Sequence, residues 1–250
     1  MNERSEKALI FGSGPAALVG ILHPGAHRQR SIGVLVVVGG PQYRVGSHRQ
    51  FVVMARALAA SGYDVLRFDY QGMGDAEGRF AGFEHCGQDI QAALDVFCKE
   101  RPALQGVAIF GLCDGASAAM MYAPRDPRIV GLIAANPWVR TEGTQAATIL
   151  RHYYWKRPFQ KSFWVKLLKG GLDIRGSVAG LSANVKQARS QAQAAPQGSY
   201  IDRMRESLRS YSGNTLVVLS GDDLTAREFA DLFDKDKAWL AARRKMRLSS

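Results

Sequence analysis

The residues Val107-Ala108-Ile109-Phe110-Gly111-Leu112-Cys113-Asp114-Gly115 place an apolar run before a glycine-flanked cysteine, and the small residues Ala116–Tyr122 follow. This order predicts a buried strand, a sharp turn and a helix, with cysteine where the commoner pattern G-x-S-x-G has serine. The two glycines let helix and strand pass closely around a strained central residue. The pattern therefore predicts that Cys113 is a nucleophile. The alternative is an ordinary strand-to-helix turn with an inert buried cysteine.

The composition bounds the class of protein. The chain has 250 residues, of which 46% are hydrophobic and 22% charged, so it can bury one sizeable core. No apolar stretch approaches the ~20 residues that cross a bilayer, and no signal peptide opens the chain, so we expect a cytoplasmic protein. Cys86, Cys98 and Cys113 form no C-x-x-C pair, which argues against a disulfide framework and a zinc site. We expect neither a metal nor an organic cofactor.

Apolar runs separated by turn signals predict alternating strands and helices. The Gly12, Gly14 and Pro15 cluster predicts a hairpin turn before a strand at 19–23. The β-branched run at 32–38 is typical of a central strand covered on both faces. Further strands are expected at 65–69, 107–110, 129–136 and 215–220, and helices at 49–61 and 86–98. This alternation predicts an α/β three-layer sandwich, with a mostly parallel sheet between helices.

The strand signal stops between residues 143 and 210, where aromatic and basic helical stretches replace it. We therefore divide the chain into an N-terminal core part (1–142), a helical basic cap insertion (143–210) and a C-terminal core part (211–250). Residues 190–199 predict a flexible loop within the insertion.

The basic charge is concentrated in the insertion. From Arg151 to Arg209, twelve bases face three acids, a net +9 within a chain of net charge +11. A solvated helical surface, a lid over an anionic substrate, and contact with lipid headgroups or nucleic acid are all compatible with it. No nucleic-acid recognition motif accompanies the charge, so we expect no specific nucleic-acid partner.

Thiolate attack on an acyl carbon needs a base, a group that orients the base, and donors for the oxyanion. The amide of Asp114, the first helical residue after Cys113, is a natural oxyanion donor. A second donor should come from the loop after the 32–38 strand. Because Pro41 has no N–H, Gln42 or Gly40 is the better candidate. The carboxylate of Asp114 would disfavour the thiolate unless it points away.

The sequence offers a candidate acid for a triad but no histidine at the usual position of the base. Asp222 and Asp223 follow the last clear strand, where a carboxylate can project over the edge of the sheet, and we prefer Asp223. None of the five histidines follows Asp223, where the chain order of such triads places one. His48 is the candidate substitute base, and a surface or helix-capping role is its alternative. We expect the loop with Asp69 and Asp75 to be structural.

Several longer motifs carry a family resemblance. They are the segments 39–51, 66–75, 111–114, 122–128, 136–141 and 220–229, which span nearly the whole chain. Together they resemble an exosortase A system-associated hydrolase of the α/β-hydrolase superfamily. The resemblance implies a cytoplasmic hydrolase associated with exopolysaccharide and protein-sorting loci of Gram-negative bacteria, with its nucleophile at Cys113 and its acid at Asp223. Similar proteins carry Asp-His-Thr-Phe and a last helix beyond the point that corresponds to Ser250, so we expect a truncated C-terminal end.

These observations favour a cysteine-dependent hydrolase that cleaves an ester, thioester or lactone through an acyl-enzyme. The substrate would be a small-molecule, glycan-linked or lipid-linked acyl compound, and the basic insertion is compatible with an anionic one. One alternative is an acyltransferase, in which an acceptor hydroxyl replaces water. Another is a non-catalytic protein that uses the basic cap to bind an anionic glycan or lipid.

Overall fold

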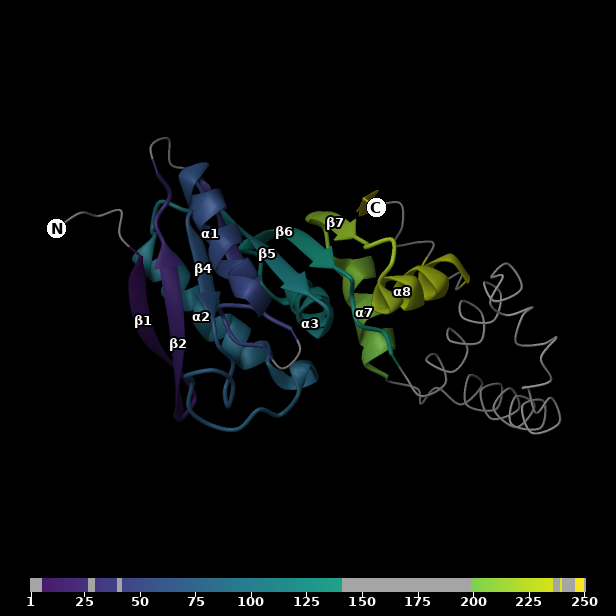
Figure 1. Cartoon of the computed structure of the whole chain (residues 1–250), viewed down its shortest axis with the longest axis horizontal. Helices are drawn as coiled ribbons and strands as arrows, with labels where there is room; N and C mark the ends of the chain where they lie inside the picture. The colour runs from purple at the N-terminus through teal and green to yellow at the C-terminus, as the bar shows by residue number, and fades with distance from the viewer. Residues whose placement is uncertain are drawn as a thin grey trace, which may run out of the picture.

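A single eight-stranded sheet organises the computed structural model, which describes residues 6–26, 30–39, 42–140, 199–235, 239 and 246–249 (Figure 1). The strand order is β1-β2-β4-β3-β5-β6-β7-β8. The strands are β1 (Lys7–Ser13), β2 (Ala16–His23), β3 (Ile32–Val37), β4 (Val65–Phe68), β5 (Gly106–Leu112), β6 (Ile129–Ala135), β7 (Asn214–Val218) and β8 (Met246–Ser249).

The direction of the strands brings the loops that follow β3, β4, β5, β6 and β7 to one edge of the sheet. β1 pairs with β2, and β2 with β4, in antiparallel fashion, whereas the pairs from β4 to β8 are parallel. Leu35 of β3 lies opposite both Leu66 of β4 and Ile109 of β5, and all three side chains are fully buried. Because the strands from β3 onward are parallel, their carboxyl ends meet at the same edge, where ligands bind in such sheets.

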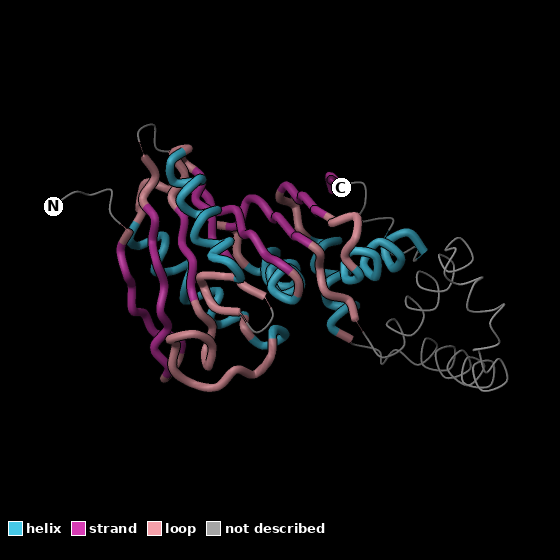
Figure 2. Tube along the Cα trace, viewed as in Figure 1, coloured by secondary structure: helices cyan, strands magenta, loops and turns pink. Residues whose placement is uncertain are grey.

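Helices cover both faces of the sheet (Figures 1 and 2). The helices of the described ranges are α1 (Gln50–Ala60), α2 (Gly87–Glu100), α3 (Asp114–Tyr122), α7 (Tyr200–Ser210) and α8 (Leu224–Lys235), with short 3-10 turns η1 (Ser47–Arg49), η2 (Phe83–His85) and η3 (Ala123–Arg125). Phe51 of α1 contacts Phe110 on one face, and Phe97 of α2 lies against Gly33 on the other. The predicted three-layer α/β sandwich is confirmed.

The predicted strands and helices agree with the structure to within a few residues. The expected hairpin is formed by β1 and β2, with Gly14 in its turn at a φ of 60°. Two elements, α8 and β8, had no counterpart in the sequence prediction, whereas α7 lies within the insertion expected to be helical. None of the described helices is both long and apolar enough to cross a membrane.

Most of the predicted cap lies outside the described residues. Its last part forms α7, which buries Met204 and Leu208 and packs against α3, where the Ser207 hydroxyl donates to the Met121 carbonyl at 3.3 Å. The helix begins at Ser199, whose side chain accepts a hydrogen bond from the Asp202 amide at 3.3 Å. α7 thus belongs to the helical layer on the sheet. The domain limits at 142 and 210, and the placement of a cap over the sheet edge, stay predictions.

The loop after β4 is held by a buried carboxylate. Asp69 is fully buried and accepts hydrogen bonds from the amides of Arg44 (2.6 Å) and Asp75 (3.1 Å), and from the Arg44 guanidinium. Asp75 also pairs with Arg44, at 2.6 Å, but its side chain is 65% exposed. The expectation that this loop is structural agrees with these contacts.

Two substitutions distinguish the contributions of Asp69 and Asp75 to the stability of the fold. We expect Asp69→Ala to lower the free energy of unfolding by about 3–5 kcal/mol, because it leaves the half-buried Arg44 and two amides without their acceptor. Asp75→Ala removes an exposed partner of the same arginine and should cost about 0–1 kcal/mol. Urea unfolding of both variants measures the difference. Equal, small losses would contradict a structural role for Asp69.

Candidate active site

Cys113 occupies a strained turn between β5 and α3. Its φ of 57° and ψ of −125° lie outside the regions that non-glycine residues favour. The backbone is held on both sides: the Cys113 amide donates to the Ala135 carbonyl at 2.9 Å, and its carbonyl accepts from the Trp138 amide at 3.2 Å. The turn is therefore fixed by the end of β6 and the loop that follows it.

Three glycines make this turn sterically feasible. A Cβ on Gly111 would lie 2.5 Å from the Gly115 carbonyl oxygen, and one on Gly115 would lie 2.6 Å from the Val37 oxygen. A Cβ on Gly39, just after β3, would lie 1.9 Å from the Leu112 oxygen. Any side chain at these positions would force backbone apart. The G-x-C-x-G spacing thus reflects close packing of the turn against β3, α3 and the loop after β3.

The environment of the thiol disfavours the thiolate. Burial raises the pKa of Cys113 to about 11, and the carboxylates of Asp114 and Asp223 act in the same direction. The Asp114 backbone amide and the Arg140 guanidinium lower the pKa but do not compensate. The helix N-terminus therefore does not activate the thiol by itself, and the adverse effect foreseen for the Asp114 carboxylate is present.

The predicted oxyanion donors are only partly described. Asp114 begins α3, and its amide faces the turn at the helix N-terminus. The Gln42 side-chain oxygen accepts from the Ser47 amide at 3.1 Å and from Gln50 Nε2 at 3.2 Å, so this side chain is tied to its own loop. Gly40 and Pro41 lie outside the described residues. The assignment of Asp114 and Gln42 to an oxyanion hole stays a prediction.

Asp223 is better placed than Asp222 for the role of acid. Asp223 Oδ1 accepts from the Ala226 amide at 3.0 Å in the first turn of α8, and its charge acts on Cys113. Asp222 is fully exposed and pairs with Arg227 at 3.0 Å. These contacts favour Asp223 over Asp222 as the candidate acid. The catalytic role of Asp223 stays a prediction.

The described histidines do not complete a triad. His48 is exposed, has a φ of 50°, and its Nδ1 lies 3.0 Å from the Ser47 hydroxyl. His23, at the end of β2, is buried beside Arg67 of β4, and burial lowers the pKa of His23 to about 4. Among the described residues, no histidine is hydrogen-bonded to Cys113 or Asp223. His27 and His152 lie outside the described ranges, and His48 as a substitute base stays a prediction.

The loop after β6 contains residues that the sequence analysis did not single out. Asn136, at a φ of 44°, links the ends of β6 and β7: its Oδ1 accepts from the Ser220 amide at 2.9 Å, and its Nδ2 donates to the Ser220 hydroxyl at 3.0 Å. Farther along the loop, Arg140 pairs with Glu228 of α8 at 3.1 Å. The polar Asn136 and Arg140 directly after an apolar strand were the available signal.

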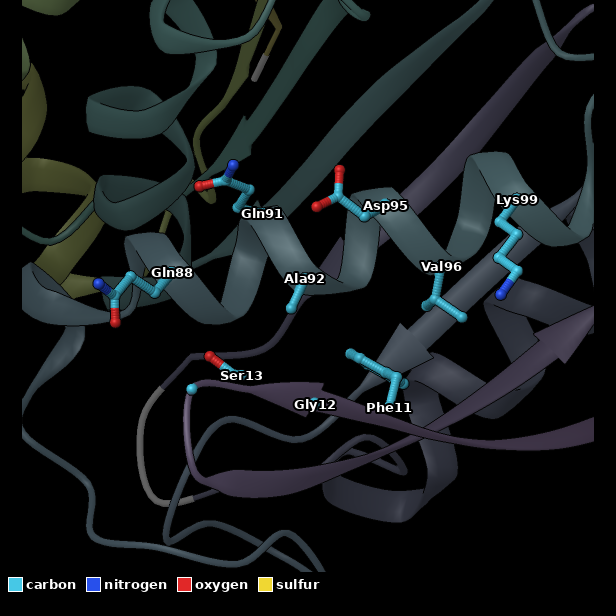
Figure 3. A pocket seen from close by; sticks show the side chains of 10 residues that line it. Phe11, Gly12, Ser13, Gln88, Gln91, Ala92, Asp95, Val96 and Lys99 are labelled. Carbon is cyan, nitrogen blue, oxygen red and sulfur yellow. The ribbon is translucent and has the colours of Figure 1, made fainter.

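Other cavities lie apart from this site. A groove of about 520 Å³ runs between β1 and α2, where Phe11, Ala92 and Val96 face one another beside Asp95 and Lys99 (Figure 3). A second, more polar cavity of about 570 Å³ lies among η2, α2 and α7. Neither is lined by Cys113 or Asp223.

Comparisons with known proteins agree with this fold. The solved structures that resemble it include an esterase, Pf2001, from Pyrococcus furiosus (TM-score 0.64, 14% identity, 98% of this chain and 80% of that chain). A carboxyl esterase from Bacillus coagulans is also similar, with a TM-score of 0.60 and 15% identity over 98% of this chain and 88% of that chain. A proline iminopeptidase from Mycobacterium smegmatis has a TM-score of 0.57 and 15% identity over 97% of this chain and 89% of that chain.

One curated relative is the uncharacterized protein RP471 of Rickettsia prowazekii (strain Madrid E), which is 30% identical over 133 residues. That alignment spans 53% of this chain and 56% of the relative. The hydrolase family described as serine aminopeptidase, S33, matches residues 30–235. The chain therefore belongs to the serine aminopeptidase S33 family of hydrolases.

Proposed function

We propose that this protein hydrolyses an ester-type bond through a covalent intermediate on Cys113. The Cys113 thiolate would attack the acyl carbon, and collapse of the tetrahedral intermediate would expel the leaving group, which takes up a proton. Water would then cleave the thioester and regenerate the thiol. Amides at the start of α3 would stabilise the oxyanion in both steps.

The observation that carries this proposal is the backbone of Cys113. A positive φ in a non-glycine residue at a strand-to-helix turn is costly, and here it is maintained by contacts with β3, β6 and α3. The turn lies at the carboxyl edge of the parallel strands, where this fold places its nucleophile. The family match and the esterases among similar folds support the same class of reaction.

The raised pKa limits the rate that this thiol can reach unaided. With a pKa of about 11, roughly one thiol in ten thousand is ionised at pH 7. Efficient acylation needs a group that accepts the proton during attack, and deacylation needs one that activates water. His48 is the candidate within this sequence, in the loop after β3.

The finer part of the proposal concerns biological context. Three of the segments that carry the resemblance to exosortase A system-associated hydrolases include described residues at the same edge of the sheet: 42–51 after β3, 66–75 at the end of β4 and beyond it, and 220–229 after β7. This clustering supports a shared substrate class, an acyl compound of an exopolysaccharide system. A cytoplasmic location belongs to the same proposal.

Pre-steady-state kinetics with 4-nitrophenyl acetate test the reaction. We expect a slow burst that approaches one equivalent of nitrophenolate, followed by little turnover, because acylation by a thiolate is easier than hydrolysis of the thioester without a base. Cys113→Ala should abolish the burst, whereas the matched variant Cys98→Ala should retain it.

Rapid turnover that His48→Ala abolishes would confirm His48 as the base. A burst that persists in Cys113→Ala would contradict the proposed nucleophile.

The carboxylates near Cys113 predict that the rate of its alkylation at pH 8 depends on Asp114. Asp114→Asn removes a carboxylate that raises the pKa of Cys113, so a larger fraction is thiolate at pH 8 and alkylation by iodoacetamide should accelerate. Asp222→Asn removes the same charge from an exposed position and should leave the rate within about twofold. Peptide mass spectrometry over time measures both. Equal acceleration in the two variants would show an effect of net charge only.

A further inference from the structure

Arg140 is held in place by a buried carboxylate. Its Nε donates to both carboxylate oxygens of Glu228, at 3.2 and 3.1 Å, and the Glu228 side chain is 0% exposed. A carboxylate removed from water in this way needs a fixed cation beside it. The pair also joins the loop after β6 to α8, two elements far apart in the sequence.

Two further contacts restrict Arg140. Its guanidinium carbon lies 4.5 Å from the centre of the Trp138 ring, and its backbone carbonyl accepts a hydrogen bond from the Tyr200 hydroxyl at 3.0 Å. The side chain remains 24% exposed. Within the described part of the chain, Glu228 engages only Nε, and Nη1 and Nη2 have no hydrogen-bond partner. The planar group thus keeps a pair of nitrogens, with four N–H donors, on a rigid support.

These donors lie near the candidate nucleophile. The amide of Trp138, two residues before Arg140, donates to the Cys113 carbonyl at 3.2 Å. Arg140 is also close enough for its charge to lower the pKa of Cys113. The cation and the thiol therefore belong to two neighbouring loops that a backbone hydrogen bond joins at the carboxyl edge of the sheet.

We propose that Arg140 binds a carboxylate carried by the acyl part of the substrate, so that the enzyme prefers acyl groups with a second, anionic end. The inference rests on the proposed function and names its substrate class. Two parallel N–H donors on a planar guanidinium match the two oxygens of a carboxylate, and the indole face and Glu228 fix their direction.

The neighbouring carboxylates are engaged elsewhere. Glu228 is paired with Arg140 itself, and Asp223 accepts from the Ala226 amide at the start of α8. Asp114 Oδ1 points toward the loop after β3, because a Cβ built on Gly39 would lie 2.5 Å from it. The alternative role for Arg140 is purely structural, as the partner of Glu228 between the β6 loop and α8.

Alkylation by a matched pair of reagents tests the proposal without requiring turnover. Iodoacetate is anionic and iodoacetamide neutral, and both react with the thiolate, so the ratio of their rates at Cys113 is insensitive to changes in the Cys113 pKa. Peptide mass spectrometry at low ionic strength gives this ratio for each variant. Cys98 in the same samples serves as the internal reference for the Arg140 and Glu228 variants, whereas Arg128→Gln is compared with the wild type at Cys113 alone, because the Arg128 charge acts on Cys98.

Arg140→Gln should lower the iodoacetate-to-iodoacetamide ratio at Cys113 by about fivefold to tenfold, because one nearby cation is lost. Arg140→Lys should retain most of the preference. Glu228→Gln separates the two roles: it breaks the pair but keeps the cation, so the ratio should stay at or above the wild-type value. If the role is only structural, Glu228→Gln and Arg140→Gln will change the ratio alike, which would overturn the proposal.

Two controls complete this design. Arg128→Gln removes another carboxylate-paired arginine, one that binds Asp126 and Asp95 at 2.6 and 2.7 Å, and should not change the ratio at Cys113. An equal fall in Arg128→Gln would overturn the proposal. If Arg140→Gln fails to fold, the double variant Arg140→Gln/Glu228→Gln removes both charges together and should show the same loss.

A pair of esters distinguishes this inference from the proposed function. Acylation of Cys113 by mono-4-nitrophenyl glutarate should exceed that by 4-nitrophenyl pentanoate. Arg140→Gln should bring the ratio of the two rates close to one, because its effect on the thiolate slows both reactions alike and cancels in the ratio. Acylation by pentanoate without a glutarate preference would overturn the role of Arg140 alone. Failure of both esters to acylate Cys113, with the alkylation ratio as expected, would overturn the proposed function alone.

Discussion

The position of Cys113 depends on the close approach of four backbone segments. The turn lies between β5 and α3, its amide is bonded to the end of β6, and its carbonyl is bonded to the loop beyond β6. Gly39 brings the loop after β3 into contact with the same turn. A positive φ of this kind costs of order 1–3 kcal/mol, so these contacts must offset it. The sheet thus holds the candidate nucleophile at its carboxyl edge.

A second strained residue continues this arrangement. Asn136 has a φ of 44° and bonds the end of β6 to Ser220 beyond β7. Ser220 is three residues before Asp223, so the loop that holds the Cys113 turn also holds the strand end that carries the candidate acid. The candidate nucleophile and the candidate acid come from distant parts of the sequence, and Asn136 joins the strand ends that support them.

The charges and the burial around Cys113 disfavour the thiolate, although the position of Cys113 in the turn is typical of a nucleophile. Burial and two carboxylates keep the thiol protonated, and one arginine acts against them. Such a thiol is protected from indiscriminate reaction, and its nucleophilicity depends on whatever accepts its proton when a substrate is bound. Arg140 has a double effect in this account, since it favours the thiolate and offers donors to an anionic acyl group.

The sequence predicted the elements whose signals are local. The apolar run before Gly111, the β-branched run at 32–38 and the Gly14 turn each led to the correct element. α8 was missed although Ala226, Phe229 and Phe233 recur at helical spacing, because the acidic turn before it was interpreted only as the end of a strand. β8 was missed because the Met246–Ser249 strand has only four residues. The Arg140–Glu228 pair could not be predicted, because only the tertiary fold brings residues 88 positions apart together.

The candidate nucleophile was predictable because the turn requires small residues at fixed spacing, whereas the pKa of Cys113 was not. A helix N-terminus favours a thiolate, yet burial and the position of Asp223, which raise the pKa of Cys113, depend on packing that the sequence does not display. The direction of the net effect emerged only from the three-dimensional arrangement.

The most direct test of the central claim is to identify the acylated residue. Protein mixed briefly with 4-nitrophenyl acetate can be quenched in acid and mapped by peptide mass spectrometry. We expect an acetyl group on the peptide that contains Cys113, and hydroxylamine should remove it as it does from a thioester. Acetylation of Cys98, His48 or lysines with Cys113 unmodified would contradict it.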